Sequence, residues 1–62
     1  MVRTQAQVVY RPEHTSHPYR ALILTGEFEG SEFCVPPSTV AFVGEFVEVE
    51  FHPADQFASI VR

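Results

Sequence analysis

The stretch Glu45-Phe46-Val47-Glu48-Val49-Glu50-Phe51 is the most informative part of this chain for its fold class. Successive side chains of a β-strand point to opposite faces, and this stretch alternates with that period of two. One face is apolar and consists of Val47, Val49 and Phe51. The opposite face carries Glu48 and Glu50. The pattern therefore predicts a strand with one buried face and one solvated face.

Three other stretches are typical of strands. Residues 5–11 alternate, and their one face consists of Ala6, Val8 and Tyr10. Residues 19–28 begin with the apolar run Ala21-Leu22-Ile23-Leu24, which favours a strand covered on both faces. Residues 57–62 predict a last strand. Pro12 is expected to end the run of residues 5–11 and Pro53 the run of residues 45–51, because proline lacks a backbone donor.

The strongest hairpin signal is Glu29-Gly30-Ser31-Glu32. A two-residue Gly-Ser loop fits a type II′ turn, in which glycine tolerates the positive φ of the first central position. This register places Phe28 opposite Phe33 and Glu29 opposite Glu32. Pro36-Pro37 is predicted to end the strand that follows, and Ser38 and Thr39 to cap a short turn.

These elements amount to five or six short strands and no convincing helix. Spacing of this kind predicts a single all-β domain over residues 1–62, a small five- to six-stranded antiparallel β-barrel or sandwich. A 62-residue domain has a thin core, which favours stabilisation by a partner or by a second copy of the chain.

The net charge of −4 is unevenly distributed along the chain. Residues 1–26 hold three arginines and one glutamate, a net charge of +2, whereas residues 27–62 carry a net charge of −6. We therefore expect the two halves to attract each other, in the fold or across a symmetric interface. The negative total disfavours ligands whose binding is dominated by phosphate, so a nucleic acid is an unfavourable partner.

Targeting signals are not apparent. The N-terminal residues lack the apolar segment of a signal peptide, and the longest apolar runs are far shorter than a membrane span. Cys34 is the only cysteine, which excludes a disulfide within the chain. A cytoplasmic protein with no membrane contact is the expectation.

Side chains that carry chemistry are few. His14, His17, His52 and Cys34 are the residue types of a tetrahedral zinc site, but strong zinc motifs use closely spaced cysteine pairs, and this chain has none. Cys34 with a histidine would resemble a nucleophile and its base, although so short a chain leaves little room for an oxyanion hole and a substrate cleft. We expect a non-enzymatic protein with no catalytic, cofactor-binding or metal-binding residues, and Cys34 as a small buried side chain.

The candidate partner-binding residues are acidic: Glu29, Glu32, Glu48 and Glu50. They would attract a basic partner, and the alternative is an ordinary solvated strand face. Four aromatic side chains would instead stack on bases if the barrel bound nucleic acid: Tyr10, Tyr19, Phe28 and Phe33. Glutamates rather than cations are interleaved with the hairpin aromatics, so core packing is the favoured interpretation.

Several fragments, in order, resemble the C-terminal β-barrel domain of elongation factor Tu. They are Ala6–Tyr10, Pro18–Leu22, Val43–Val49, His52–Ala54 and Phe57–Ile60. The resemblance implies a translation-factor barrel without its GTPase domain, and in that family the barrel helps to bind aminoacyl-tRNA and other proteins.

The sequence departs from the family pattern in three places. Val43 stands where the family has proline, Ser59 interrupts the final apolar motif, and the family's last strand would lie beyond Arg62. The matched positions are framework positions, so the resemblance assigns no binding residue. The negative net charge argues against tRNA as a ligand.

The first functional hypothesis is a small interaction module that binds a protein partner or itself. A narrower version is an acidic inhibitor of the phage or plasmid type, which covers a basic face of its target. The alternative is a small barrel that binds RNA or single-stranded DNA.

Overall fold

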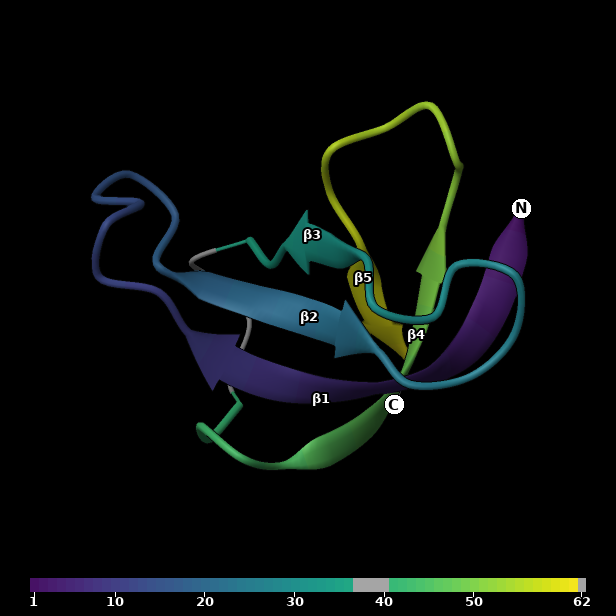
Figure 1. Ribbon diagram of the computed structural model, residues 1–62, viewed down its shortest axis with the longest axis horizontal. Helices are drawn as coiled ribbons and strands as arrows, with labels where there is room; N and C mark the ends of the chain where they lie inside the picture. The colour runs from purple at the N-terminus through teal and green to yellow at the C-terminus, as the bar shows by residue number, and fades with distance from the viewer. Residues whose placement is uncertain (37–40, 62) are drawn as a thin grey trace.

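The computed structural model describes residues 1–36 and 41–61 and contains five strands (Figure 1). They are β1 (Val2–Tyr10), β2 (Tyr19–Ile23), β3 (Glu32–Cys34), β4 (Phe46–Phe51) and β5 (Ser59–Val61). All five belong to one sheet in the order β3-β2-β1-β4-β5, and neighbouring strands are antiparallel. No helix occurs in the described ranges, and hence none there that would cross a bilayer. The prediction of a small antiparallel all-β fold is confirmed.

The long strand β1 joins the two halves of the sheet. Its residues 6–10 pair with β2, and its residues 2–7 pair with β4. The two ladders overlap only at Ala6 and Gln7, so most of β1 has a partner on one side alone. Figure 1 shows β1 curving along its length, and this curvature brings the outer strands β3 and β5 toward each other.

The two edges of the sheet meet at one point. The Cys34 amide donates to the Gln56 carbonyl at 2.8 Å, and the Ala58 amide donates to the Cys34 carbonyl at 2.9 Å. Between them lies an isolated parallel bridge from Cys34 to Phe57. The sheet is thus curled like a barrel, but a single bridge rather than a continuous ladder joins β3 to the segment before β5.

The core lies inside this curled sheet. It consists of Ala6, Val8, Ala21, Ile23, Phe33, Val35, Val47, Val49, Phe51 and Ala58. The predicted apolar face of residues 45–51 is therefore confirmed, as are Ala6 and Val8 of the first strand. Leu22 and Leu24 are only half-buried, so the prediction that β2 is covered on both faces is wrong. Strand β2 alternates like the others, with Ala21 and Ile23 buried and Arg20 and Leu22 of intermediate exposure.

The predicted two-residue hairpin at Gly30-Ser31 is also wrong. Strand β2 ends at Ile23, whose amide donates to the Ser31 carbonyl at 2.9 Å, and residues 24–30 form a longer loop. Phe28 does not face Phe33. Both rings contact Phe51 instead, Phe28 edge-on at 5.5 Å and Phe33 stacked at 4.2 Å between ring centroids. The longer loop lets a third aromatic ring join the core, which favours it over the tight turn.

The aromatic residues expected in the core divide into two groups. Phe33 is buried and Phe28 packs against the core, as predicted. Tyr10 and Tyr19 are 47% and 45% exposed, and their rings contact each other at 5.4 Å where the β1–β2 ladder ends. The turn predicted at Ser38 and Thr39 lies outside the described residues.

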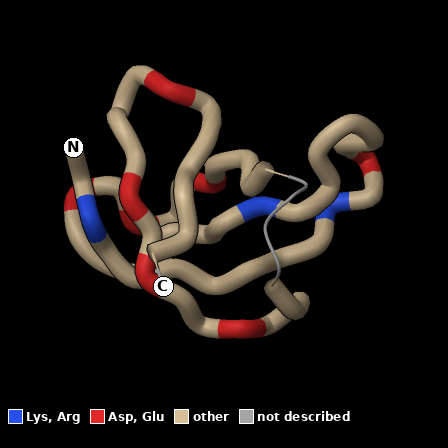
Figure 2. The backbone as a smooth tube through the Cα atoms, turned by 180° about the vertical axis from the view of Figure 1, so that it is seen from behind, with Lys and Arg blue, Asp and Glu red and all other residues tan. Residues whose placement is uncertain are grey.

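Ion pairs connect the basic first half of the chain to the acidic second half. Figure 2 shows where the basic and acidic residues lie along the backbone. Arg3 pairs with Glu48 and Glu50, and Arg11 and Arg20 both pair with Glu32. Each of these arginines lies before residue 27 and each glutamate after it. The expected attraction between the two halves therefore acts within the fold.

Candidate functional site

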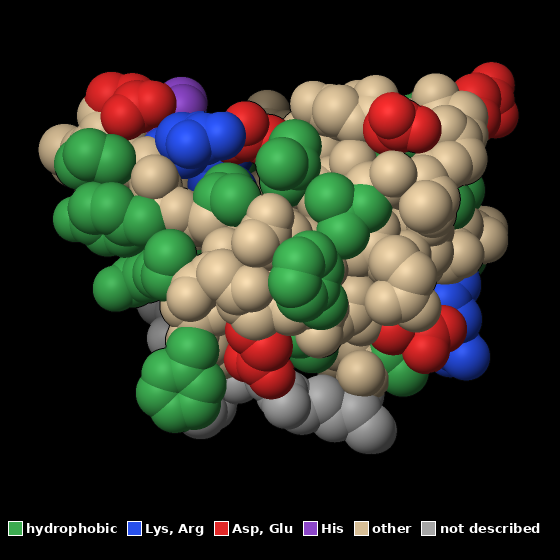
Figure 3. All heavy atoms as spheres, turned by 60° about the horizontal axis from the view of Figure 1, so that its bottom comes forward, with side chains coloured by type: hydrophobic (Ala, Val, Ile, Leu, Met, Phe, Trp, Pro, Cys, Tyr) green, Lys and Arg blue, Asp and Glu red, His purple; other side chains and the backbone are tan. Residues whose placement is uncertain are grey.

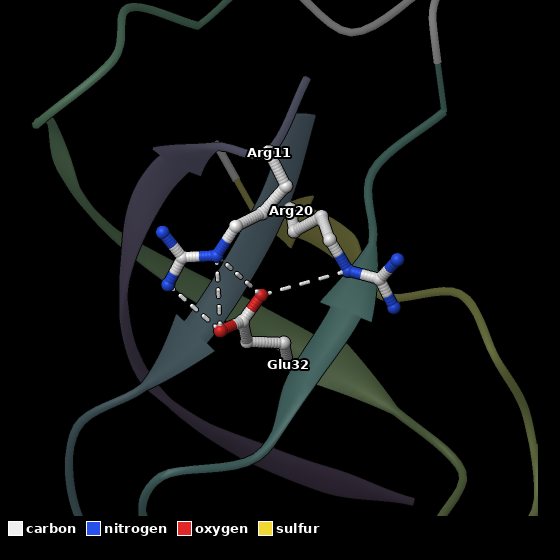
Figure 4. Close-up of polar contacts among 3 residues, drawn as sticks. All are labelled: Arg11, Arg20 and Glu32. Atoms are coloured by element: carbon white, nitrogen blue, oxygen red, sulfur yellow. Dashed lines mark hydrogen bonds and ion pairs between the residues drawn. The ribbon is translucent and has the colours of Figure 1, made fainter. Parts of the chain in front are cut away.

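Glu32 on β3 lies between two arginines (Figure 4). Arg11 follows β1 and reaches Glu32 with three hydrogen bonds of 2.8 to 3.3 Å from Nε and Nη2. Arg20 on β2 approaches from the other side, with its Nε 3.7 Å from Glu32 Oε1. The register places Glu32 opposite Leu22, so its side chain shares the outer face of the sheet with Arg20, two residues from Leu22.

The two arginines interact with Glu32 in different ways. Hydrogen bonding from Arg11 holds the pKa of the Glu32 carboxyl below its ordinary value, against the opposing effect of burial. Arg20 contributes a longer-range attraction only, because 3.7 Å is beyond a normal hydrogen bond. Arg20 Nε is buried and has no hydrogen-bond partner among the residues that the structure describes. Figure 4 shows its terminal nitrogens pointing away from Glu32.

Arg20 and Glu32 form part of the wall of an open cleft of about 440 Å³. The loop between β1 and β2 contributes His14, Thr15, Ser16 and His17. The loop between β4 and β5 contributes Asp55 and Gln56, and β3 contributes Phe33 and Cys34. The two loops approach each other through an edge-on contact of 5.1 Å between the His17 and Phe57 rings.

The residues considered for zinc do not assemble into a metal site. His14, His17 and Cys34 line the same cleft, and His52 is not among its lining residues. No cluster of three or more metal-ligating side chains is present within residues 1–36 and 41–61. Cys34 is buried, as expected for a small apolar side chain.

The four acidic candidates do not form one continuous patch. Glu32 lies on β3, whereas Glu48 and Glu50 lie on β4, and β2 and β1 separate these strands in the sheet. Glu29 lies in the exposed loop between β2 and β3. Glu32 is engaged by Arg11, and Glu48 and Glu50 by Arg3. Their role in partner binding stays a prediction.

A second surface feature is a turn that exposes two phenylalanines, Phe42 and Phe46, which are 76% and 69% exposed. The turn is well hydrogen-bonded. The Glu45 amide donates to the Phe42 carbonyl at 3.0 Å, the Phe42 amide donates to Glu45 Oε1 at 3.1 Å, and the Gly44 amide donates to the Val8 carbonyl at 2.7 Å. The exposure of both rings is therefore a property of an ordered segment.

A further apolar side chain, Val43, is exposed within this turn. The turn itself is bonded to β1 at Val8. Figure 3 looks onto this side of the molecule and shows hydrophobic side chains gathered there beside acidic ones. We call Phe42, Val43 and Phe46 the aromatic surface.

Part of the aromatic surface was detectable in the sequence. The alternation that buries Val47 and Val49 places Phe46 on the same face as Glu48 and Glu50, which is the solvated face. Nothing in the local pattern marks Phe42 as exposed, because it lies in an apolar run typical of a core segment.

Comparison with known proteins returned no relative: no family model, no curated protein and no solved structure matches the chain. The resemblance to the elongation factor Tu barrel therefore stays a prediction.

Proposed function

We propose that this protein is an interaction module that binds another protein through the aromatic surface. The observation that carries the proposal is the ordered turn at residues 42–45, which holds Phe42 and Phe46 in solvent. Exposing such rings costs free energy in the isolated chain, and contiguous exposed apolar surface is a mark of interaction sites. Aromatic side chains are also the usual anchors of protein interfaces.

The charge of the module indicates the chemistry of its partner. The net charge of −4, together with Glu45 in the turn and Glu48 on β4, favours a target that is apolar at its centre and basic around it. A second copy is the less favourable occupant, because two copies with the same net charge repel each other. An acidic inhibitor that covers a basic face of its target agrees with this chemistry.

The test compares wild-type protein with the double variant Phe42→Ser, Phe46→Ser as bait in the same cell lysate. A partner captured by wild type is then purified, and its affinity is measured by calorimetry. We expect the double variant to bind at least about a hundredfold more weakly, since interface anchors each contribute about 2 kcal/mol or more. The association rate should fall as salt increases, because the charges steer the encounter.

The matched control is Phe57→Ser, which removes a partly exposed ring outside the aromatic surface. It should bind the partner as wild type does. Equal binding by the double variant would refute the proposal. Light scattering over a range of concentrations measures whether the protein self-associates. If wild type forms a dimer and the double variant does not, a second copy of the chain occupies the surface.

The position of the cleft suggests a second candidate function, which is the binding of RNA or single-stranded DNA. In the OB-fold, a five-stranded Greek-key barrel, the face of strands 2 and 3 and the loops 1–2 and 4–5 bind oligonucleotides. The cleft here is lined by β3 and by the corresponding two loops. The likeness is one of architecture alone, and the acidic charge opposes it. Fluorescence anisotropy with labelled RNA and single-stranded DNA at low salt decides the matter, since this candidate requires salt-sensitive binding.

A further inference from the structure

The cleft contains the guanidinium group of Arg20, whose interactions within the described residues are few. The Arg20 side chain is only 17% exposed, yet its one ion-pair contact within residues 1–36 and 41–61 is the 3.7 Å approach to Glu32. Its Nε is buried and has no hydrogen-bond partner in the same part of the chain. A buried donor without an acceptor is costly, so a guanidinium in this position gains free energy when a ligand supplies one.

Glu32 does not fill this need. Its two carboxylate oxygens accept three hydrogen bonds from Arg11, so most of its capacity is committed to that partner. The terminal nitrogens of Arg20 point away from it (Figure 4). The planar fork of a guanidinium matches the two oxygens of a carboxylate, and the fork of Arg20 is available for such a pair.

Other donors line the same cleft. The loop between β1 and β2 supplies the hydroxyls of Thr15 and Ser16, and His17 Nδ1 is a second buried nitrogen without a partner in the described ranges. Phe33 and Cys34 add apolar groups to the lining. The volume of about 440 Å³ lies within the range of small-molecule sites.

The charges around the cleft select the type of anion. Arg11 pairs with Glu32, and Asp55 on the β4–β5 loop lines the cleft together with Arg20, so the positive and negative charges of these four side chains are equal in number. The cleft therefore has no excess positive charge for a dianion such as a phosphate monoester. A monoanion that makes directed contacts with Arg20 is the better match.

We propose that this cleft binds a small organic carboxylate, with its two oxygens at the Arg20 guanidinium and its apolar body against Phe33 and Cys34. This site is separate from the aromatic surface and does not depend on the function proposed for that surface. Thr15, Ser16 and His17 orient the bound carboxylate.

The test is a titration of wild-type ¹⁵N-labelled protein with benzoate, followed by NMR and compared with a sodium chloride titration of equal ionic strength. We expect saturable shifts of the Thr15, Ser16 and His17 amides and of the Arg20 Nε–H resonance. Benzyl alcohol, which has the same ring without the charge, should leave these resonances in place. Inorganic phosphate and a short single-stranded DNA complete the set of probes.

Four other outcomes of these titrations would overturn the proposal. Equal shifts with benzyl alcohol would mean a purely apolar cleft, and equal shifts with sodium chloride a general salt effect. Tighter binding of phosphate or of the DNA would assign the cleft to phosphate chemistry. No shift with benzoate would mean that the cleft binds no simple carboxylate.

Two substitutions at the same position refine the test. Arg20→Gln should weaken benzoate binding at least tenfold, and Arg20→Lys should weaken it severalfold because the charge remains but the fork is lost. The control Arg3→Gln removes an arginine of the other ion-pair network and should leave the affinity within twofold. If Arg20→Gln does not fold, the wild-type titration and Arg20→Lys still decide the question. Unchanged affinity in Arg20→Lys would contradict the assigned role of the fork.

Discussion

Glu32 is a residue whose side chain interacts with two other segments of the fold. It lies on an edge strand, accepts hydrogen bonds from Arg11 beyond the end of β1, and attracts Arg20 on β2. The hydrogen bonds from Arg11 lower its pKa below the ordinary 4.5. A carboxyl group whose pKa is lowered by folding binds fewer protons in the folded state, so it stabilises that state above its ordinary pKa.

Replacement of Glu32 by glutamine should therefore have an effect that depends on pH. At about pH 7 the variant should be less stable than wild type by up to about 1 kcal/mol, the upper range for partly exposed ion pairs. As the pH falls through the lowered pKa, wild type loses this contribution and the two proteins converge. Urea unfolding at about pH 7 and about pH 3 measures both differences.

The control is Glu27→Gln, which makes the same change in net charge on an exposed loop. It should show no comparable convergence. A Glu32→Gln difference that is the same at both pH values would contradict the assigned coupling to Arg11.

The turn at residues 42–45 is the element that determines the proposed interaction surface. Gly44 has a φ of 91°, a conformation that other residues adopt only with strain. Its amide is bonded to the Val8 carbonyl, and its carbonyl accepts from the Gln7 side chain at 3.3 Å. The geometry of this glycine thus fixes the turn against β1 and keeps both phenylalanines outside the core.

Substitution of Gly44 by alanine should destabilise the protein by about 1 to 2 kcal/mol. A Cβ at this position would meet no other atom within 4 Å, so the cost is one of backbone strain alone. Asparagine tolerates the left-handed region better than alanine. The stability of Gly44→Asn should therefore lie between those of wild type and Gly44→Ala. Urea denaturation of the three proteins measures the order, and an alanine variant as stable as wild type would contradict the turn geometry.

Closure of the sheet is a property of the whole molecule. Residues 34 and 58 are far apart in sequence, yet the amides of Cys34 and Ala58 donate across the junction between β3 and the segment before β5. Ala58 lies outside the five strands but is buried in the core. The junction covers one side of the core, so we expect it to open only when the molecule unfolds.

Hydrogen exchange tests this directly. The Cys34 and Ala58 amides should exchange as slowly as those of the central β1–β4 ladder, with the free energy of global unfolding. The exposed Glu27 amide serves as the fast-exchanging reference. Fast exchange at Cys34 and Ala58 alone would mean that the sheet is open along this edge.

The fold class was predictable from the sequence, and much of the candidate site was not. Alternation located β4 and its buried face, since that pattern depends only on which residues avoid water. The interactions of Phe28, Phe33 and Phe51 were not predictable from local turn preferences. The loop of residues 24–30 is determined by where an aromatic ring finds a partner in the core.

Three properties could be derived from the order of the residues alone: the chain is all-β, the face of Val47, Val49 and Phe51 is buried, and the two halves attract each other. These properties follow from hydrophobic periodicity and charge, which act over a few residues or over the whole chain. Two further properties could be seen only in the folded chain: Arg11, Arg20 and Glu32 meet beside a cleft, and Phe42 and Phe46 stay exposed. Both depend on the curvature of β1 and on strand register, which arise from the packing of all strands together.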